Sequence, residues 1–448
     1  MNPAVPQNGK RTILHITPHL GGGVGSVLLN YLEVVRHDRH FTHRICSLEY
    51  ANERSLKASR TSGFPLHDKM FNDINSLLAA ANQADIVLVH WWNHPLLYAL
   101  LVRESFPPAR IIFWSHISGL NPPYVFSDPA LAYPDLFVFT SPISLKTKEV
   151  VKLGLERQER LRVIWSTGGI EHITSVKPKP HTGFNIGYIG TVDYGKLHPH
   201  FLDMCLGINI PEAHFTVCGG SSEKQIQAEL TRDKNRFTFT GPIANIKPYL
   251  SEFDIFGYPL APYHYGTCEQ VLGESMAAGI PPVVLANLTE SYIVENEVTG
   301  LVAQNEASYM RAIESLYYNS DLRKRLANNA RKAARKMYSL DLMAERWEKV
   351  FDEALQYPKT PRQWTGNHQG KGVSAAQVFI ESLGQSATIF EKSLNAQTER
   401  EKEKALEGIK SLYGSSQLWR SGTKGTANHY HLFFPEDKNL KLWADLTN

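Results

Sequence analysis

The chain has 448 residues, of which 42% are hydrophobic and 20% are charged, the composition of a folded globular protein. It excludes a largely disordered chain, a collagen-like fibre and a coiled-coil rod, and at about 150 residues per domain the length predicts two or three domains. Lys and Arg total 47 against 44 for Asp and Glu, so the net charge of +3 gives no pervasive basic surface for nucleic acid.

The first third of the chain alternates short apolar runs with segments of helix length. A glycine loop, Gly21-Gly22-Gly23, follows the first run, and a helix is expected from about Ser26. The apolar runs are predicted to be strands at 12–17, 85–90, 110–114 and 135–140. Strands that alternate with helices predict right-handed crossovers and a parallel sheet.

A second alternation begins after a stiff polar stretch, Lys177-Pro178-Lys179-Pro180, which is typical of an interdomain linker. Strands are predicted at 185–189, 214–218, 237–240, 254–258 and 282–285, and a long helical region at about 306–355. The predicted fold class is α/β, with two tandem Rossmann-like domains at 1–180 and 181–357 that face a cleft. Ligands of such folds bind at the carboxyl ends of the strands, so we expect the site in that cleft.

The last part of the chain, residues 358–448, differs from the rest. Tyr357 to Gly372 is rich in Pro, Gly, Gln and Lys and is typical of a linker. Residues 373–412 show helical spacing and predict a helical hairpin packed on the body of the protein or on a second subunit. The mixed charges at 399–404 disfavour a membrane-binding helix. His429 and His431 are expected on a short strand or tail.

The segment Tyr263 to Pro282, YHYGTCEQVLGESMAAGIPP, is the most specific in the sequence. A strand ends there in an irregular loop, and a helix is predicted from near Cys268, with Thr267 as N-cap and Glu269 in the first turn. The N-terminus of a helix can hold phosphate. Glu274, one turn further along, can direct a carboxylate at hydroxyl groups of the same ligand.

This segment resembles the signature of family 4 retaining glycosyltransferases, enzymes of the GT-B fold that transfer sugars from nucleotide-sugar donors. The run from Glu274 to Pro281 matches the second half of the signature. The resemblance implies that Glu274 holds the donor ribose. The first glutamate of the signature falls on Gly266, and Glu269 is the candidate for a displaced carboxylate; the alternative is a first-turn residue that complements the helix dipole.

The resemblance covers about residues 12–355 and implies further site residues. The loop with Gly22 and Gly23 lies beside the diphosphate, and His116 faces the transferred sugar; the alternative for His116 is a hydrogen-bonded core histidine. Lys196 contacts the diphosphate, and Thr191 stands where the family has an arginine. The remaining implied donor contacts are at Gly241, Ile243, Gly266, Thr267 and Cys268.

The chemistry of the resemblance is sugar transfer without a metal. A departing nucleotide diphosphate is stabilised by a fixed cation and a helix N-terminus. The sequence has no Asp-x-Asp, the spacing that holds a divalent cation on the diphosphate, so no metal or cofactor is expected. The expected catalytic residues are His116, Lys196 and Glu269. The expected enzyme is a retaining, hexosyl-type transferase acting on a glycan, lipid-linked or protein acceptor, in cell-surface polysaccharide biosynthesis.

Two alternatives stay open. Thr191 and Gly266 favour a catalytically silent scaffold that binds a nucleotide sugar, and nucleotide-sugar epimerases share the fold. The run from His90 to His94 is not expected to bind metal, because no carboxylate is adjacent. Few and scattered cysteines predict a cytoplasmic protein. A surplus of basic residues in the first 180 residues makes peripheral contact with a membrane a further possibility. Residues 358–448 are the segment through which homo-oligomers could form. The cysteines are Cys46, Cys205, Cys218 and Cys268.

Overall fold

The computed structural model describes residues 9–420 and 424–446. Contacts divide the chain into two compact units, unit 1 with Met1–Gly168 and Leu340–Asn448, and unit 2 with Gly169–Ser339. The chain therefore enters unit 2 ahead of the Lys-Pro stretch at 177–180 and returns to unit 1 at residue 340, before the end of the predicted long helical region. No helix in the described part of the chain is long and apolar enough to cross a membrane.

Unit 1 is built on a seven-stranded sheet in the order β3-β2-β1-β4-β6-β7-β8, with every neighbouring pair parallel. The order reverses between β1 and β4, the kind of position at which open α/β sheets bind ligands outside the carboxyl ends of their strands. The four predicted strands correspond to β1, β4, β6 and β7, and three further strands complete the sheet. Their bounds are β1 Arg11–Thr17, β2 Phe41–Ser47, β3 Leu66–His67, β4 Ile86–Trp91, β6 Ile111–Ser115, β7 Leu136–Phe139 and β8 Leu161–Val163.

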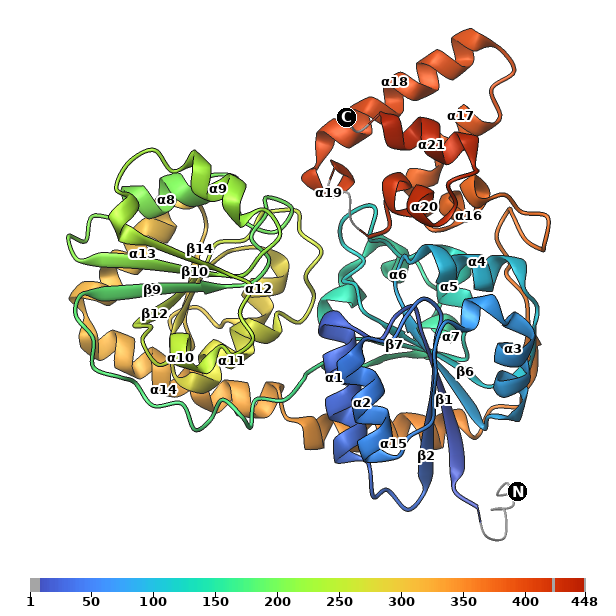
Figure 1. Cartoon of the computed structure of the whole chain (residues 1–448), viewed down its shortest axis with the longest axis horizontal. Helices are drawn as coiled ribbons and strands as arrows, with labels where there is room; N and C mark the ends of the chain where they lie inside the picture. Colours follow the sequence, from blue (N-terminus) through green and yellow to red (C-terminus); the bar gives the residue numbers. More distant parts are fainter. Residues whose placement is uncertain (1–8, 421–423, 447–448) are drawn as a thin grey trace. The chain divides into compact units, whose positions relative to one another are not determined.

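The helices of unit 1 cover both faces of this sheet, and α15 packs beside α1 (Figure 1). Helix α1 begins at Gly22, four residues before the predicted Ser26, because Gly21 is its extended N-cap and the glycines form its first turn. The core on this side joins Trp114 of β6 to Trp347 of α15. The helices are α1 Gly22–Val34, α2 Glu53–Ser62, α3 Ile74–Gln83, α4 Pro95–Arg103, α5 Asp128–Ala132, α6 Lys148–Val151, α7 Leu155–Gln158 and α15 Leu340–Ala354.

The C-terminal segment is an ordered part of unit 1. Within the stretch predicted as a linker, β15 (Thr360–Arg362) pairs antiparallel with β5 (Phe106–Ala109), and Trp364 is 1% exposed. The linker prediction was wrong because the indole of Trp364 packs inside and its Nε1 donates to Glu381.

A mainly helical extension follows, as predicted. Residues 373–412 fold into α16, α17 and most of α18, and α16 packs against α4. His429 and His431 lie on α20, not on a strand or tail, because Thr426 caps that helix at the backbone N–H of His429. The helices are α16 Ala375–Glu381, α17 Ala387–Leu394, α18 Glu399–Ser415, α19 Gln417–Arg420, α20 Ala427–Phe433 and α21 Lys438–Asp445.

Unit 2 has a six-stranded parallel sheet in the order β11-β10-β9-β12-β13-β14, which reverses between β9 and β12. All five predicted strands are present, and β14 is an addition. The strands are β9 Phe184–Ile189, β10 Ala213–Cys218, β11 Phe237–Gly241, β12 Ile255–Tyr258, β13 Pro282–Leu285 and β14 Leu301–Ala303. The helices are α8 Phe201–Gly207, α9 Glu223–Glu229, α10 Lys247–Leu250, α11 Gln270–Ala278, α12 Leu288–Ile293, α13 Glu306–Tyr318 and α14 Ser320–Met337.

Candidate functional site

The loop between β12 and α11 carries a network of buried polar contacts. Helix α11 begins at Gln270 with Glu269 as its N-cap, so the predicted start near Cys268 and the predicted cap Thr267 were both wrong. The carbonyl of Cys268 accepts a hydrogen bond from the Tyr338 hydroxyl at 2.8 Å, which holds the chain short of the helix. Glu269 has φ 33°, a left-handed conformation that is costly for a residue other than glycine.

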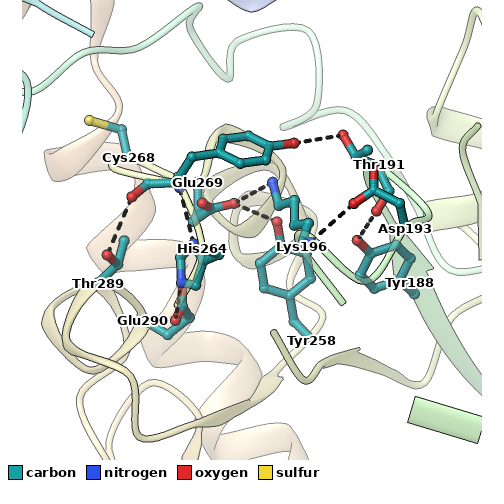
Figure 2. A network of polar contacts seen from close by, with 12 residues as sticks. Tyr188, Thr191, Asp193, Lys196, Tyr258, His264, Cys268, Glu269, Thr289 and Glu290 are labelled. Atoms are coloured by element: carbon teal, nitrogen blue, oxygen red, sulfur yellow. Dashed lines mark hydrogen bonds and ion pairs between the residues drawn. The ribbon is translucent and has the colours of Figure 1, made fainter. Parts of the chain in front are cut away.

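This backbone turn directs the Glu269 side chain inward. Its Oε2 accepts from Lys196 Nζ at 2.9 Å and from the Tyr258 hydroxyl at 2.5 Å (Figure 2). Lys196 comes from the loop after β9, and Tyr258 is the last residue of the neighbouring strand β12. The side chains of Glu269 and Lys196 are 3% and 13% exposed. The structure thus brings together two of the three predicted catalytic residues.

Charge complementarity keeps both members of this pair ionised. Burial alone would raise the pKa of Glu269, but Lys196, His264 and the Tyr258 hydroxyl outweigh it and lower that pKa. Burial would likewise lower the pKa of Lys196, and the Glu269 carboxylate overcomes it and raises that pKa. A buried ammonium is therefore fixed beside the start of α11 before any ligand arrives.

The position of the Glu269 carboxylate explains why residue 266 is a glycine. A Cβ atom built on Gly266 would lie 1.6 Å from Glu269 Oε1, so no side chain fits at position 266 while that carboxylate is in place. The carboxylate of Glu269 thus occupies the space where a side chain at position 266 would begin.

A second buried pair, which the sequence did not reveal, lies behind Glu269. His264 Nε2 is 3.1 Å from Glu290 Oε2, and the Gly266 N–H donates to His264 Nδ1 at 3.0 Å. Glu290, on α12, is 0% exposed, and its Oε1 has no hydrogen-bond partner among the described residues. The only sequence signal was the place of His264 within the Tyr263 to Pro282 segment.

The described part of the chain has three groups of His and Glu residues, and within each group the possible metal-ligand atoms lie within 4.8 Å of one another. In two of these groups, hydrogen bonds show which ring nitrogen of a histidine carries the proton. In unit 1, His94 Nε2 lies 3.2 Å from Glu49, which corrects the expectation that no carboxylate is adjacent to His94. However, the Leu96 N–H donates to His94 Nδ1, so the ring proton is on Nε2 and faces Glu49. The Gly266 N–H imposes the same tautomer on His264. His94 and His264 therefore offer a metal no bare nitrogen, whereas Nδ1 of His19, the third member of the group in unit 1, has no hydrogen-bond partner among the described residues. Freedom from metal stays a prediction.

The other predicted donor contacts of unit 2 surround the network. Thr191 accepts from the Tyr265 hydroxyl at 3.3 Å, and its own carbonyl accepts from Tyr188 at 2.7 Å. Glu274 lies on α11 with its side chain 15% exposed and His172 Nε2 at 3.8 Å, and burial raises its pKa to about 7. Gly241 ends β11 with φ 67°, and Ile243 and Thr267 are half-buried.

The predicted residues of unit 1 lie at the carboxyl ends of its strands. Gly22 and Gly23 are exposed in the first turn of α1, and Gly22 has φ 59°. His116 follows β6 directly, and its Nε2 is 3.0 Å from His90 Nδ1. The hydrogen bond agrees with the alternative reading of His116 as a partnered histidine, and the residue is half-buried.

Comparison with known proteins finds a family match within unit 2. Residues 183–319 match the profile of the family described as Glycosyl transferases group 1. YtcC of Bacillus subtilis (strain 168), whose name places it among glycosyltransferases, is 27% identical over 165 residues, 32% of this chain. The match spans 39% of YtcC's length.

Solved structures extend the likeness to both units and show that the chain has the GT-B fold. Anabaena Alr3699/HepE in complex with UDP aligns with a TM-score of 0.61 and 15% identity, over 76% of this chain and 100% of that one. A glycosyltransferase from Rickettsia africae has a TM-score of 0.60 and 15% identity, over 78% and 100% of the two chains. Sucrose-phosphate synthase of Thermosynechococcus elongatus has a TM-score of 0.58 and 17% identity over the same shares.

Proposed function

We propose that the protein is a metal-independent, retaining glycosyltransferase that moves a hexose from a nucleotide diphosphate sugar to a glycan, lipid-linked or protein acceptor in cell-surface polysaccharide biosynthesis. The observation that carries the proposal is the buried Lys196–Glu269 pair beside the start of α11. A pre-formed cation and a helix N-terminus are what a departing diphosphate needs. The group 1 match over residues 183–319 supports the assignment.

In the proposed reaction the bond between the anomeric carbon and the diphosphate oxygen breaks, and a bond from the acceptor hydroxyl oxygen to that carbon forms. The hydroxyl proton passes to the departing diphosphate on the same face, so the configuration is retained. Lys196 holds its charge through this step because Glu269 raises its pKa. Glu269, fixed by Tyr258, accepts hydrogen bonds from sugar hydroxyls, Glu274 binds the ribose, and His116 contacts the sugar.

The donor to test first is a UDP-sugar, since structures of Anabaena HepE hold UDP and UDP-glucose. The chain would be mixed with UDP-glucose and other nucleotide sugars in the presence of EDTA. Donor loss, free UDP and the anomeric configuration of the product would be measured by NMR. A product of inverted configuration contradicts the retaining mechanism, and activity that EDTA abolishes contradicts metal independence.

Lys196→Met tests the residue that carries the proposal. We expect it to reduce transfer at least a hundredfold, because removing one preorganised stabilising group typically costs about that much. Lys224→Met, at an exposed position on α9, is the matched control and should stay active. A fully active, folded Lys196→Met variant would overturn the role of Lys196.

The silent scaffold is favoured by one observation, Thr191 at the position of the family's arginine. Gly266 no longer supports it, because the Glu269 carboxylate fills that space. The same NMR experiment separates the alternatives: a scaffold binds UDP without turnover, an epimerase returns an isomerised donor, and a transferase yields a new glycoside.

A further inference from the structure

Four histidines form a continuous hydrogen-bonded chain across the sheet of unit 1. They come from β2, β1, β4 and the residue after β6, which are consecutive in the sheet. His43 Nδ1 lies 2.9 Å from His15 Nε2, His15 Nδ1 lies 3.0 Å from His90 Nε2, and His90 Nδ1 lies 3.0 Å from His116 Nε2. Each of the first three rings therefore forms its hydrogen bond to the next ring through Nδ1, and the next ring takes part through Nε2.

The four rings are neutral. His15 and His90 are fully buried, and burial holds their pKa values well below the ordinary value. Burial lowers the pKa of His43 to about 4 and that of His116 to about 3. A neutral imidazole carries one N–H and one bare nitrogen. Each bond in the chain consequently joins an N–H of one ring to a bare nitrogen of the next.

Only two proton arrangements satisfy all three bonds. Either every ring carries its proton on Nδ1, or every ring carries it on Nε2, because reversing one bond leaves two protons or two lone pairs facing each other. The chain is therefore a single unit, and the proton at one end fixes the proton at the other.

The far end of the chain decides between the two arrangements. His43 Nε2 is buried against Tyr31 and Phe351 and has no hydrogen-bond partner among the described residues. Buried N–H groups without a partner are rarer than buried acceptors without one. The arrangement with all protons on Nδ1 leaves His43 Nε2 without a proton and is therefore favoured. His116 then has its Nδ1–H left over for another partner.

We propose that His43, His15 and His90 are positioning residues that fix His116 as its Nδ1–H tautomer, so that His116 presents a hydrogen-bond donor to an oxygen of the sugar substrate. The sugar oxygen as the partner of His116 rests on the proposed function. The tautomer itself depends only on the geometry of unit 1.

The test is nitrogen NMR of the full-length protein labelled with ¹⁵N in its histidine rings. Protonated and bare ring nitrogens resonate in separate regions, and single His-to-Gln variants assign the four rings. We expect all four to carry the proton on Nδ1. An Nε2–H form of His116, or rings of mixed tautomer within the chain, would overturn the inference.

Changing the far end of the chain tests the coupling. His43→Asn places beside His15 an amide that can either donate its N–H or accept through its C=O, so both proton arrangements are satisfied there and His116 should become a mixture of tautomers. Transfer should fall roughly two- to tenfold in kcat, the worth of about one hydrogen bond, with the donor KM unchanged. His15→Asn is the second variant if His43→Asn does not fold.

The matched control is His67→Asn, at an exposed position on β3 of the same sheet but outside the chain. It should leave both the nitrogen resonances and kcat unchanged. A pure Nδ1–H signal for His116 in His43→Asn contradicts the coupling even in an active enzyme. A wild-type protein without transfer contradicts the proposed function, and the nitrogen resonances then still decide the tautomer.

Discussion

At the scale of single residues, the site depends on one carboxylate placed by a strained backbone. Glu269 takes a left-handed φ of 33°, and such strain persists only where the surroundings determine it. Here Lys196 and Tyr258 draw the carboxylate inward, and Gly266 leaves room for it. Any side chain at position 266 would displace the carboxylate.

Glu274 gives a pH-dependent prediction at the same scale. Burial raises its pKa to about 7, from 4.5 for an ordinary glutamate. The folded protein therefore binds more protons than the unfolded chain between about pH 4.5 and 7, and the free energy of unfolding falls as pH rises through that window. Glu274→Gln should remove this part of the pH dependence and make unit 2 more stable than wild type at pH 8.

Urea unfolding at pH 5 and pH 8 measures the effect, with Glu295→Gln at an exposed position of unit 2 as the control. The control should follow wild type at both pH values. If Glu274→Gln also follows wild type, the carboxyl group of Glu274 is not the buried acid described above.

At the scale of elements, the sequence predicted the strands that are made of buried apolar runs. Each predicted strand exists because its residues form a continuous apolar run between two polar segments, as in β4 and β6. The strands that were missed are short, such as β8 and β14, or carry polar side chains, such as β2 with Arg44. The start of α11 was misplaced because its position depends on contacts from Lys196 and Tyr338, which no local pattern contains.

Helix α4 gives a prediction at this scale. Its residues from Pro95 to Val102 are all buried, and a helix that is apolar all round must be covered on every side. The C-terminal segment provides cover, since α16 and α20 pack against α4 and β15 pairs with β5. Deleting residues 358–448 should therefore destabilise unit 1 and make it aggregate.

Soluble yield and Tm of the truncated chain test this, and Trp364→Ala is a milder companion that should cost about 3–5 kcal/mol of unfolding free energy. Lys438→Ala, at an exposed position on α21, is the control. A truncated chain that stays monomeric with an unchanged Tm would show that α4 needs no cover.

At the scale of the whole molecule, the sequence predicted two α/β domains but not which helix belongs to which. The helical periodicity through α14 and α15 predicts helices and does not name the sheet that each covers. In the structure α15 lies in unit 1, where Trp347 packs on Trp114. The candidate residues with a sequence signature stay predictions. The His264–Glu290 pair and the histidine chain could not be predicted, because their members become neighbours only when segments distant in the sequence pack together.

The division into units predicts where a nucleotide acts. UDP without a sugar should bind the residues of unit 2, because the predicted diphosphate and ribose contacts Lys196 and Glu274 both lie there. At about 100 times its dissociation constant, UDP should add about 2.7 kcal/mol to the free energy of unfolding of the unit it binds. Hydrogen exchange should then slow in α11 and β12 and stay unchanged in β2 and β3 of unit 1, with or without EDTA.

The Lys196→Met variant separates specific protection from a general effect of the nucleotide. It lacks the cation for the diphosphate, so UDP should slow exchange in α11 less than in wild type, while the Lys224→Met control behaves as wild type. Equal protection of both units, or protection that is lost with EDTA, would mean that the nucleotide is held by something other than the buried pair of unit 2. Protection of α11 that is present in wild type and reduced in Lys196→Met shows that the ammonium of Lys196 contributes beyond the partial positive charge of the helix N-terminus.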